Sequence, residues 1–201
     1  WQSTVMVTNG AHLDISENKA CGGGGILLAD NSKLSVEGRE SQLTVARNII
    51  RCDRSAKAKL LGIEQMGGAG ILATGDGSSI SVKDQAKVVV MHNTIYISLD
   101  SEISALKPGG GISLHHGTSL NVQDAEIHFV GNTATGSAGG LALFSRANAH
   151  IDAPKSTKSS FRDNEAQGGF GGAIGFVSTL DNPDDGSSSC FRKNYNKKRC
   201  K

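Results

Sequence analysis

Proline and aromatic residues are scarce in this sequence, with 3 prolines and 4% aromatic residues among 201. Proline removes a backbone donor from a central β-strand, so its scarcity is compatible with extensive hydrogen-bonded sheets. No apolar run reaches the roughly 18 residues that a membrane-spanning helix needs. The net charge of +2 gives no support for a nucleic-acid surface. We therefore expect no direct membrane span and no nucleic-acid partner.

A short motif recurs along the whole chain. An apolar residue, two variable residues and an asparagine occur six times, and the asparagines are Asn18, Asn48, Asn93, Asn132, Asn164 and Asn194. A glycine pair, or its close equivalent, and an apolar segment follow five of these asparagines, with the second glycine at Gly25, Gly70, Gly111, Gly140 and Gly172. Such periodic self-similarity is typical of solenoid proteins.

Between these landmarks, polar and apolar residues alternate. The stretches 79–82 (Ser-Ile-Ser-Val) and 126–129 (Glu-Ile-His-Phe) are two examples. Alternation with a period of two indicates β-strands with one buried face. Three short strands in a unit of roughly 30 residues are typical of a stacked coil. The sequence predicts an all-β fold, a parallel β-helix of about six rungs with three short strands per rung.

The repeat runs from residue 1 to residue 201, so we expect a single β-helix segment. Because the sequence starts within one rung and stops within another, we expect it to belong to a longer protein. Terminal rungs of a solenoid need a cover. Neighbouring chain or a partner would then cover both ends.

The asparagines and glycines of the motif are expected to be structural. An asparagine at a tight corner can satisfy backbone amides that the sheet leaves over, and stacked asparagines can bond to one another as a ladder. Glycine lets the chain turn sharply into the next strand without a Cβ clash. No helix follows the glycine-rich stretches in a βαβ context, so we expect no phosphate cofactor there.

Two insertions interrupt the repeat, at 49–68 and 94–109. Both follow the asparagine corner, on consecutive rungs. They should therefore leave the same lateral face side by side. Variation in solenoid proteins concentrates in such insertions, so this face is the best candidate for a binding surface.

Four cysteines are present. Cys21 and Cys52 follow their asparagines by three and four residues, so they should lie close together on successive rungs, and we expect a disulfide between them. Cys190 and Cys200 can pair with each other or with chain outside this sequence. Cys-x-x-Cys spacing is absent, which disfavours a metal site. Disulfides imply an oxidising, extracellular or periplasmic setting.

The paired motifs resemble the repeats of the chlamydial polymorphic outer-membrane proteins. Phe161 to Asn164 with the run Gly-Gly-Ala-Ile at 171–174 is the best copy, and the earlier copies replace Phe by Ile or Val. The resemblance covers nearly the whole chain. It implies a right-handed parallel β-helix, exposed on a cell surface and used in adhesion.

The alternative is a carbohydrate-active β-helix enzyme, either a polysaccharide lyase or hydrolase, or an inactive relative. Such chemistry needs paired carboxylates on one face, or acidic calcium ligands beside a basic residue. The aspartates instead fall at differing positions of the repeat. His115 and His116 are adjacent, so in a strand they point to opposite faces and make poor joint ligands. We therefore expect no catalytic residues, no metal and no cofactor.

These observations favour a non-enzymatic structural or adhesive segment, extracellular or at a cell surface, that acts as a scaffold. The expected partners are other protein chains, flanking domains of the same protein, or surface glycans.

Overall fold

The computed structural model describes residues 2–20, 23–51, 67–96, 109–136, 138–152, 158–167 and 171–177. These residues form twenty β-strands in four parallel sheets of five strands each. Sheet A contains β1 (Thr4–Val7), β5 (Lys33–Glu37), β9 (Ser79–Lys83), β13 (Ser119–Gln123) and β17 (Asn148–Asp152). Sheet B contains β2 (His12–Ser16), β6 (Gln42–Ala46), β10 (Lys87–Met91), β14 (Glu126–Val130) and β18 (Ser160–Arg162).

The other two sheets follow the asparagines and the glycine pairs. Sheet C contains β3 (Lys19–Ala20), β7 (Ile49–Arg51), β11 (Thr94–Tyr96), β15 (Thr133–Ala134) and β19 (Glu165–Ala166). Sheet D contains β4 (Ile26–Ala29), β8 (Ile71–Thr74), β12 (Ile112–Leu114), β16 (Leu141–Phe144) and β20 (Ile174–Val177). The chain visits the four sheets in turn, so each group of four successive strands is one rung.

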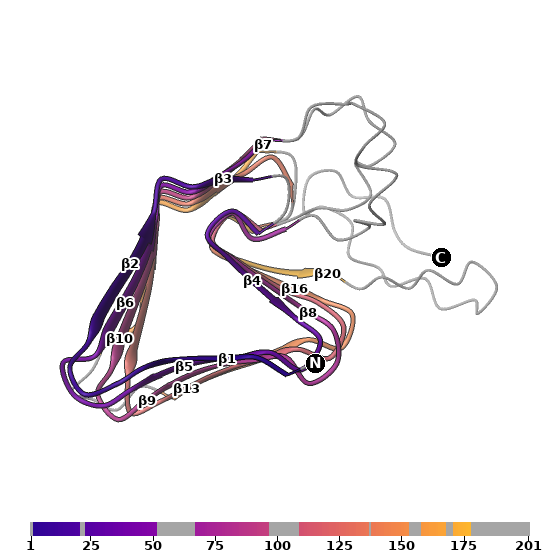
Figure 1. Ribbon diagram of the computed structural model, residues 1–201. Coiled ribbons are helices and arrows are strands. Elements are labelled where there is room, and N and C mark those ends of the chain that lie inside the picture. The colour runs from indigo at the N-terminus through magenta and orange to yellow at the C-terminus, as the bar shows by residue number, and fades with distance from the viewer. Residues whose placement is uncertain are drawn as a thin grey trace.

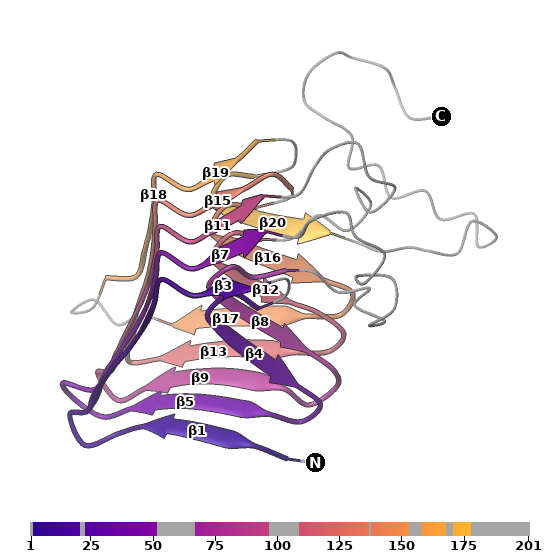
Figure 2. The same ribbon diagram turned by 45° about the horizontal axis from the view of Figure 1, so that its top comes forward.

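The rungs stack into a parallel β-helix, which confirms the predicted fold class. Seen along the stack in Figure 1, the chain runs clockwise through the four sheets while it moves away from the viewer, so the coil is right-handed. Sheets A, B and D form three sides of a triangle, and sheet C extends outward from the corner at the end of sheet B. Figure 2 shows the strands of each sheet lying side by side, one per rung.

Each rung has four strands instead of the expected three. The additional strands are those of sheet C, which are only two or three residues long. Strands this short cannot show an alternating pattern in the sequence. Five rungs lie within the described residues, and the sixth motif copy at Asn194 lies outside them.

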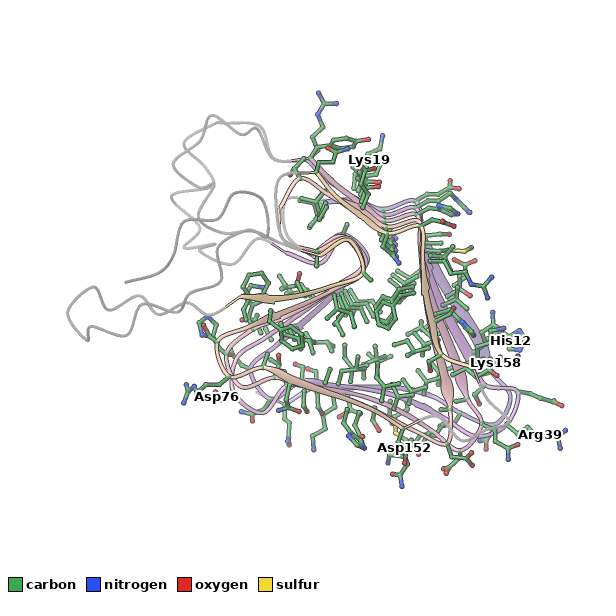
Figure 3. All side chains as sticks on the ribbon, turned by 180° about the vertical axis from the view of Figure 1, so that it is seen from behind. His12, Lys19, Arg39, Asp76, Asp152 and Lys158 are labelled. Carbon is green, nitrogen blue, oxygen red and sulfur yellow. The ribbon has the colours of Figure 1, made fainter. Side chains whose placement is uncertain are left out.

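The core forms because the alternating strands stack in register. Val45 pairs with Val90, Val90 with Phe129, and Phe129 with Phe161, so each apolar residue covers the one in the next rung. The rings of Phe129 and Phe161 are stacked with centroids 4.5 Å apart. Apolar side chains fill the interior, while the labelled charged side chains point away from it (Figure 3).

The asparagines form a ladder of side-chain hydrogen bonds along the corner between sheets B and C. Asn93 is typical and fully buried. Its backbone N–H and its Nδ2 both donate to Oδ1 of Asn132, at 3.1 and 3.0 Å, and Nδ2 also donates to the Val45 carbonyl at 2.9 Å. The same pattern joins Asn18 to Asn48, Asn48 to Asn93, and Asn132 to Asn164.

The corner is turned by the residue before each asparagine. This residue has a left-handed backbone with φ between 53° and 60° in all five rungs, at Glu17, Arg47, His92, Gly131 and Asp163. The turn places the asparagine side chain inside the corner. There it satisfies amides and carbonyls that the bending chain would otherwise leave without partners.

The glycine that precedes each of the first four strands of sheet D lies directly against the next rung. A Cβ on Gly70 would be 2.6 Å from the Gly111 carbonyl oxygen, and one on Gly111 would be 2.4 Å from the Gly140 carbonyl oxygen. In the fifth rung the equivalent position is Ala173, because Ile174 pairs with Leu141. Gly172 therefore lies one residue earlier than the sequence alignment placed it.

Candidate functional site

The two predicted insertions leave from neighbouring strands of sheet C. Strand β7 ends at Arg51 and β11 ends at Tyr96, and these two residues are direct partners in the sheet. Residues 49–51 and 94–96, assigned to the insertions from the sequence, are therefore part of the regular rung. Residues 52–66 and 97–108 lie outside the described residues. Tyr96 is 54% exposed and marks this point of departure on the surface.

The chain returns from both insertions onto the outer side of sheet D. The N–H of Gly68 donates to the Gly109 carbonyl at 3.0 Å, so the two returning segments are hydrogen-bonded to each other. The N–H groups of Gly68 and Gly109 both donate to the Ser113 hydroxyl, at 3.0 Å and 2.8 Å. Ser113 is fully buried in the middle of β12. We call the cluster of Gly67, Gly68, Gly109 and Ser113 the insertion base.

Glycine is required where the chain lies so close to the sheet. Gly68 has φ of +59°, and a Cβ on it would lie 1.9 Å from the Ile71 carbonyl oxygen. A Cβ on Gly67 would be 3.0 Å from the Ser113 side chain and 3.2 Å from Nε2 of His115. The glycines therefore let the returning backbone cover the buried serine and histidine.

The outer face of sheet D differs from that of sheet A. Its outward residues Leu72, Ala142 and Phe144 are at most 4% exposed. On sheet A, the outward residues of the central rank are half-buried or exposed and mostly polar, namely Met6, Ser35, Ser81, Asn121 and His150. Sheet D is thus buried on both faces around Leu72, Ser113 and Ala142 in its three middle strands, which their non-alternating apolar sequences match. At the N-terminal end of the same sheet, Leu27 on the outer face of β4 is 56% exposed.

His115 lies on this covered face. Its ring stacks on Phe144, with centroids 4.2 Å apart and planes tilted by 9°. Its Nε2 is buried and has no hydrogen-bond partner. Burial, aided by the nearby charge of His116, lowers the pKa of His115 from 6.5 to about 4. The imidazole is therefore neutral near pH 7.

The two adjacent histidines lie in different environments. His115 is buried, whereas His116 is exposed at a turn with φ of 49°. In the described parts of the chain, histidine, cysteine, aspartate and glutamate do not gather in any group of three that could hold a metal ion. The four cysteines, Cys21, Cys52, Cys190 and Cys200, lie outside the described residues.

Three polar side chains from two rungs are hydrogen-bonded to one another on the outer face of sheet B. Nε2 of His128 lies 3.1 Å from Oε2 of Glu126, and Nδ1 of His128 lies 2.9 Å from Oγ of Ser160. The hydrogen bond with His128 lowers the pKa of Glu126, and the Lys158 backbone and the Lys87 charge act in the same direction. A carboxylate only accepts, so Nε2 carries a hydrogen, and in the neutral imidazole Nδ1 then accepts from the serine.

This group has the connectivity of a nucleophile, a base and an orienting carboxylate. The sequence did not suggest it, because Ser160 is 32 residues from His128 and only the rung register makes them neighbours. The signal that could have found it is the alignment of the alternating strands. His128 and Ser160 then fall at the same outward position.

None of the described residues belong to a helix long and apolar enough to span a membrane. Comparisons with protein-family models, with curated proteins and with solved structures gave no match for this chain.

Proposed function

We propose that this chain is a structural or adhesive β-helix segment, extracellular or on a cell surface, that acts as a scaffold in assembly or adhesion. The observation that carries the proposal is the insertion base. Two insertions leave from adjacent partners, Arg51 and Tyr96, and return to one buried hydroxyl of Ser113. A rigid stack that fixes both ends of two insertions side by side is suited to present them to a partner.

The asparagines of the motif support a scaffold role because their side chains hold neighbouring rungs together. Asn48, Asn93 and Asn132 are fully buried and have their side-chain groups bonded to neighbouring rungs. Their side chains are therefore not available to a ligand. The resemblance to polymorphic outer-membrane protein repeats also supports surface exposure and adhesion. The expected partners are protein chains, flanking domains or surface glycans.

The proposal is tested by separating the insertions from the rod. Residues 53–65 are replaced by a Gly-Ser linker of equal length, and the far-ultraviolet circular dichroism, the melting temperature and the binding to a glycan array and to cultured cells are measured. The rod should keep its β-sheet signal while binding falls to background. Unchanged binding by the replaced protein, with the fold intact, would contradict the proposal.

The extracellular setting has a separate test. Peptide mapping of the non-reduced protein should recover Cys21 and Cys52 in one cross-linked peptide, because Ala20, directly before Cys21, pairs in sheet C with Ile50, two residues before Cys52. Recovery of both cysteines as free thiols from protein secreted into an oxidising medium would argue against this setting.

A second candidate function is hydrolysis, which the Glu126–His128–Ser160 group favours. If Ser160 is an activated nucleophile, a fluorophosphonate probe should label it, and the protein should cleave an activated ester. Ser160→Ala should abolish both, while Ser159→Ala should not. Labelling that is absent from the folded protein would remove this candidate.

A further inference from the structure

The insertion base lies over a buried histidine that has no polar partner. Ser113 and His115, two residues apart, are 0% and 4% exposed. A Cβ on Gly67 would lie 3.0 Å from Oγ of Ser113 and 3.2 Å from Nε2 of His115, so the backbone that returns from the first insertion covers both side chains. Within the described structure, Nε2 of His115 has no hydrogen-bond partner.

A protonated imidazole is strongly disfavoured in this position. Both of its ring nitrogens carry a hydrogen, so the buried Nε2 would need an acceptor or water. A buried charged group without a partner is costly. The apolar ring of Phe144 stacks on His115 and supplies no acceptor. Either the ring stays neutral, or the backbone at Gly67 moves away and lets water reach Nε2.

The charges around His115 do not offset this cost. The turn that follows His115, together with the turns stacked on either side of it, carries three exposed titratable or charged groups, Asp76, His116 and Arg146. Among the described residues none of them is hydrogen-bonded to His115, and His116 acts in the direction that keeps the ring neutral. A proton on His115 therefore gains no stabilisation while Gly67 covers the ring.

The two returning segments are held with unequal strength. The Gly68 N–H donates to the Gly109 carbonyl at 3.0 Å and to the Ser113 hydroxyl at 3.0 Å. Gly109 donates to the same hydroxyl and, in addition, forms a parallel bridge with Ala138 of the next rung. The segment over His115 is thus the less firmly attached of the two, and local openings of such segments occur without global unfolding.

We propose that the insertion base is an acid-sensitive anchor, in which a proton taken up by His115 releases Gly67 and Gly68 from the outer face of sheet D. The second insertion stays attached at Gly109, and the rungs keep their stacking. This inference deepens the scaffold function proposed above. Its consequence for a partner, that the two insertions are fixed side by side at neutral pH and not in mild acid, rests on that function.

The test is amide hydrogen exchange on the full chain from pH 7 to pH 4, with protection corrected for the intrinsic effect of pH. The reporter is the Gly68 amide. Its controls are the Gly109 amide and the Asn93 and Asn132 amides, which donate to the asparagine ladder. Protection at Gly68 should fall about tenfold for each pH unit between pH 6.5 and pH 4, because the open form binds the proton more readily. The three controls should keep their protection.

Two variants identify the group that takes up the proton. His115→Phe, which can stack on Phe144 but does not titrate, should make Gly68 protection independent of pH, whereas His116→Gln should keep the fall. The native chain decides the proposal even if His115→Phe does not fold. Constant protection at Gly68, or a fall that Gly109, Asn93 and Asn132 share, would overturn it. Binding by the insertions at neutral pH judges the scaffold function separately, so the two failures are distinguishable.

Discussion

Asn48 and Asn93, 45 residues apart in the sequence, are joined by two hydrogen bonds into one oxygen atom. The backbone N–H and Nδ2 of Asn48 each donate to Oδ1 of Asn93 at 3.0 Å. One side chain thus satisfies a backbone group and a side-chain group of the preceding rung. The distance between them along the chain depends on how long the insertion is, whereas their contact does not. This explains how the rod tolerates insertions without losing register.

Neighbouring rungs lie close together at the glycines that precede sheet D. Adding one methyl group at such a glycine should therefore lower the free energy of unfolding. Gly111→Ala should lower the free energy of unfolding by about 2–3 kcal/mol, because the new Cβ would lie 2.4 Å from the Gly140 carbonyl oxygen. The matched control is Ala173→Gly at the equivalent position of the fifth rung, which should cost only about 0.5–1 kcal/mol. Urea unfolding measures both, and equal effects would contradict the assigned register.

The insertion base predicts that Ser113 holds two segments together. Ser113→Ala removes the acceptor of the Gly109 amide and one of the two acceptors of the Gly68 amide, which keeps the Gly109 carbonyl. The buried Gly109 amide left without its acceptor should cost about 1–3 kcal/mol. Amide hydrogen exchange at Gly109 should become faster. Ser119→Ala, a half-buried serine on the outward face of β13, serves as the control. Unchanged exchange at Gly109 in Ser113→Ala would show that the serine does not anchor the segments.

The buried His115 predicts a loss of stability in mild acid. Its pKa is about 4 in the folded protein against 6.5 for an unperturbed histidine, so the unfolded chain binds the proton more readily. The contribution of this group to stability is constant above pH 6.5. It falls between pH 6.5 and pH 4, by up to about 3 kcal/mol.

His115→Phe should remove this part of the pH dependence, because phenylalanine can stack on Phe144 without taking up a proton. His116→Gln should leave most of it, since His116 is exposed. Thermal melts from pH 7 to pH 4 make the comparison. Identical pH profiles for the native chain and His115→Phe would exclude His115 as the cause.

The stacked coil was predictable from the sequence because its signals repeat. The asparagines recur at one corner, and the alternating strands fix which residues face the core, so Val45, Val90 and Phe129 were expected in equivalent places. The common departure point of the insertions also followed from the repeat. Sheet C was missed because strands as short as Thr133–Ala134 carry no periodicity.

The contacts that define the candidate site were harder to predict from the sequence. Ser113 and His115 look like ordinary strand residues, and their burial depends on segments that return across the outer face of sheet D. The signal that was present is the lack of alternation in sequences such as Ile71-Leu72-Ala73, which indicates a strand buried on both faces. Gly172 was misplaced by one residue because Ala173, not glycine, directly precedes β20, at the position that glycine holds in the first four rungs.

The most direct test of the account is the stability of the ladder at its centre. Asn132 accepts from Asn93 and donates to Asn164 at 2.9 Å and to the Val90 carbonyl at 2.8 Å. Asn132→Leu leaves these buried groups without partners, so the free energy of unfolding should fall by about 3 kcal/mol or more, with a markedly lower melting temperature. Asn121→Leu, on the outward face of the same rung, should change it by less than about 0.5 kcal/mol. Equal melting temperatures for these two variants would contradict the ladder as the element that holds the rungs together.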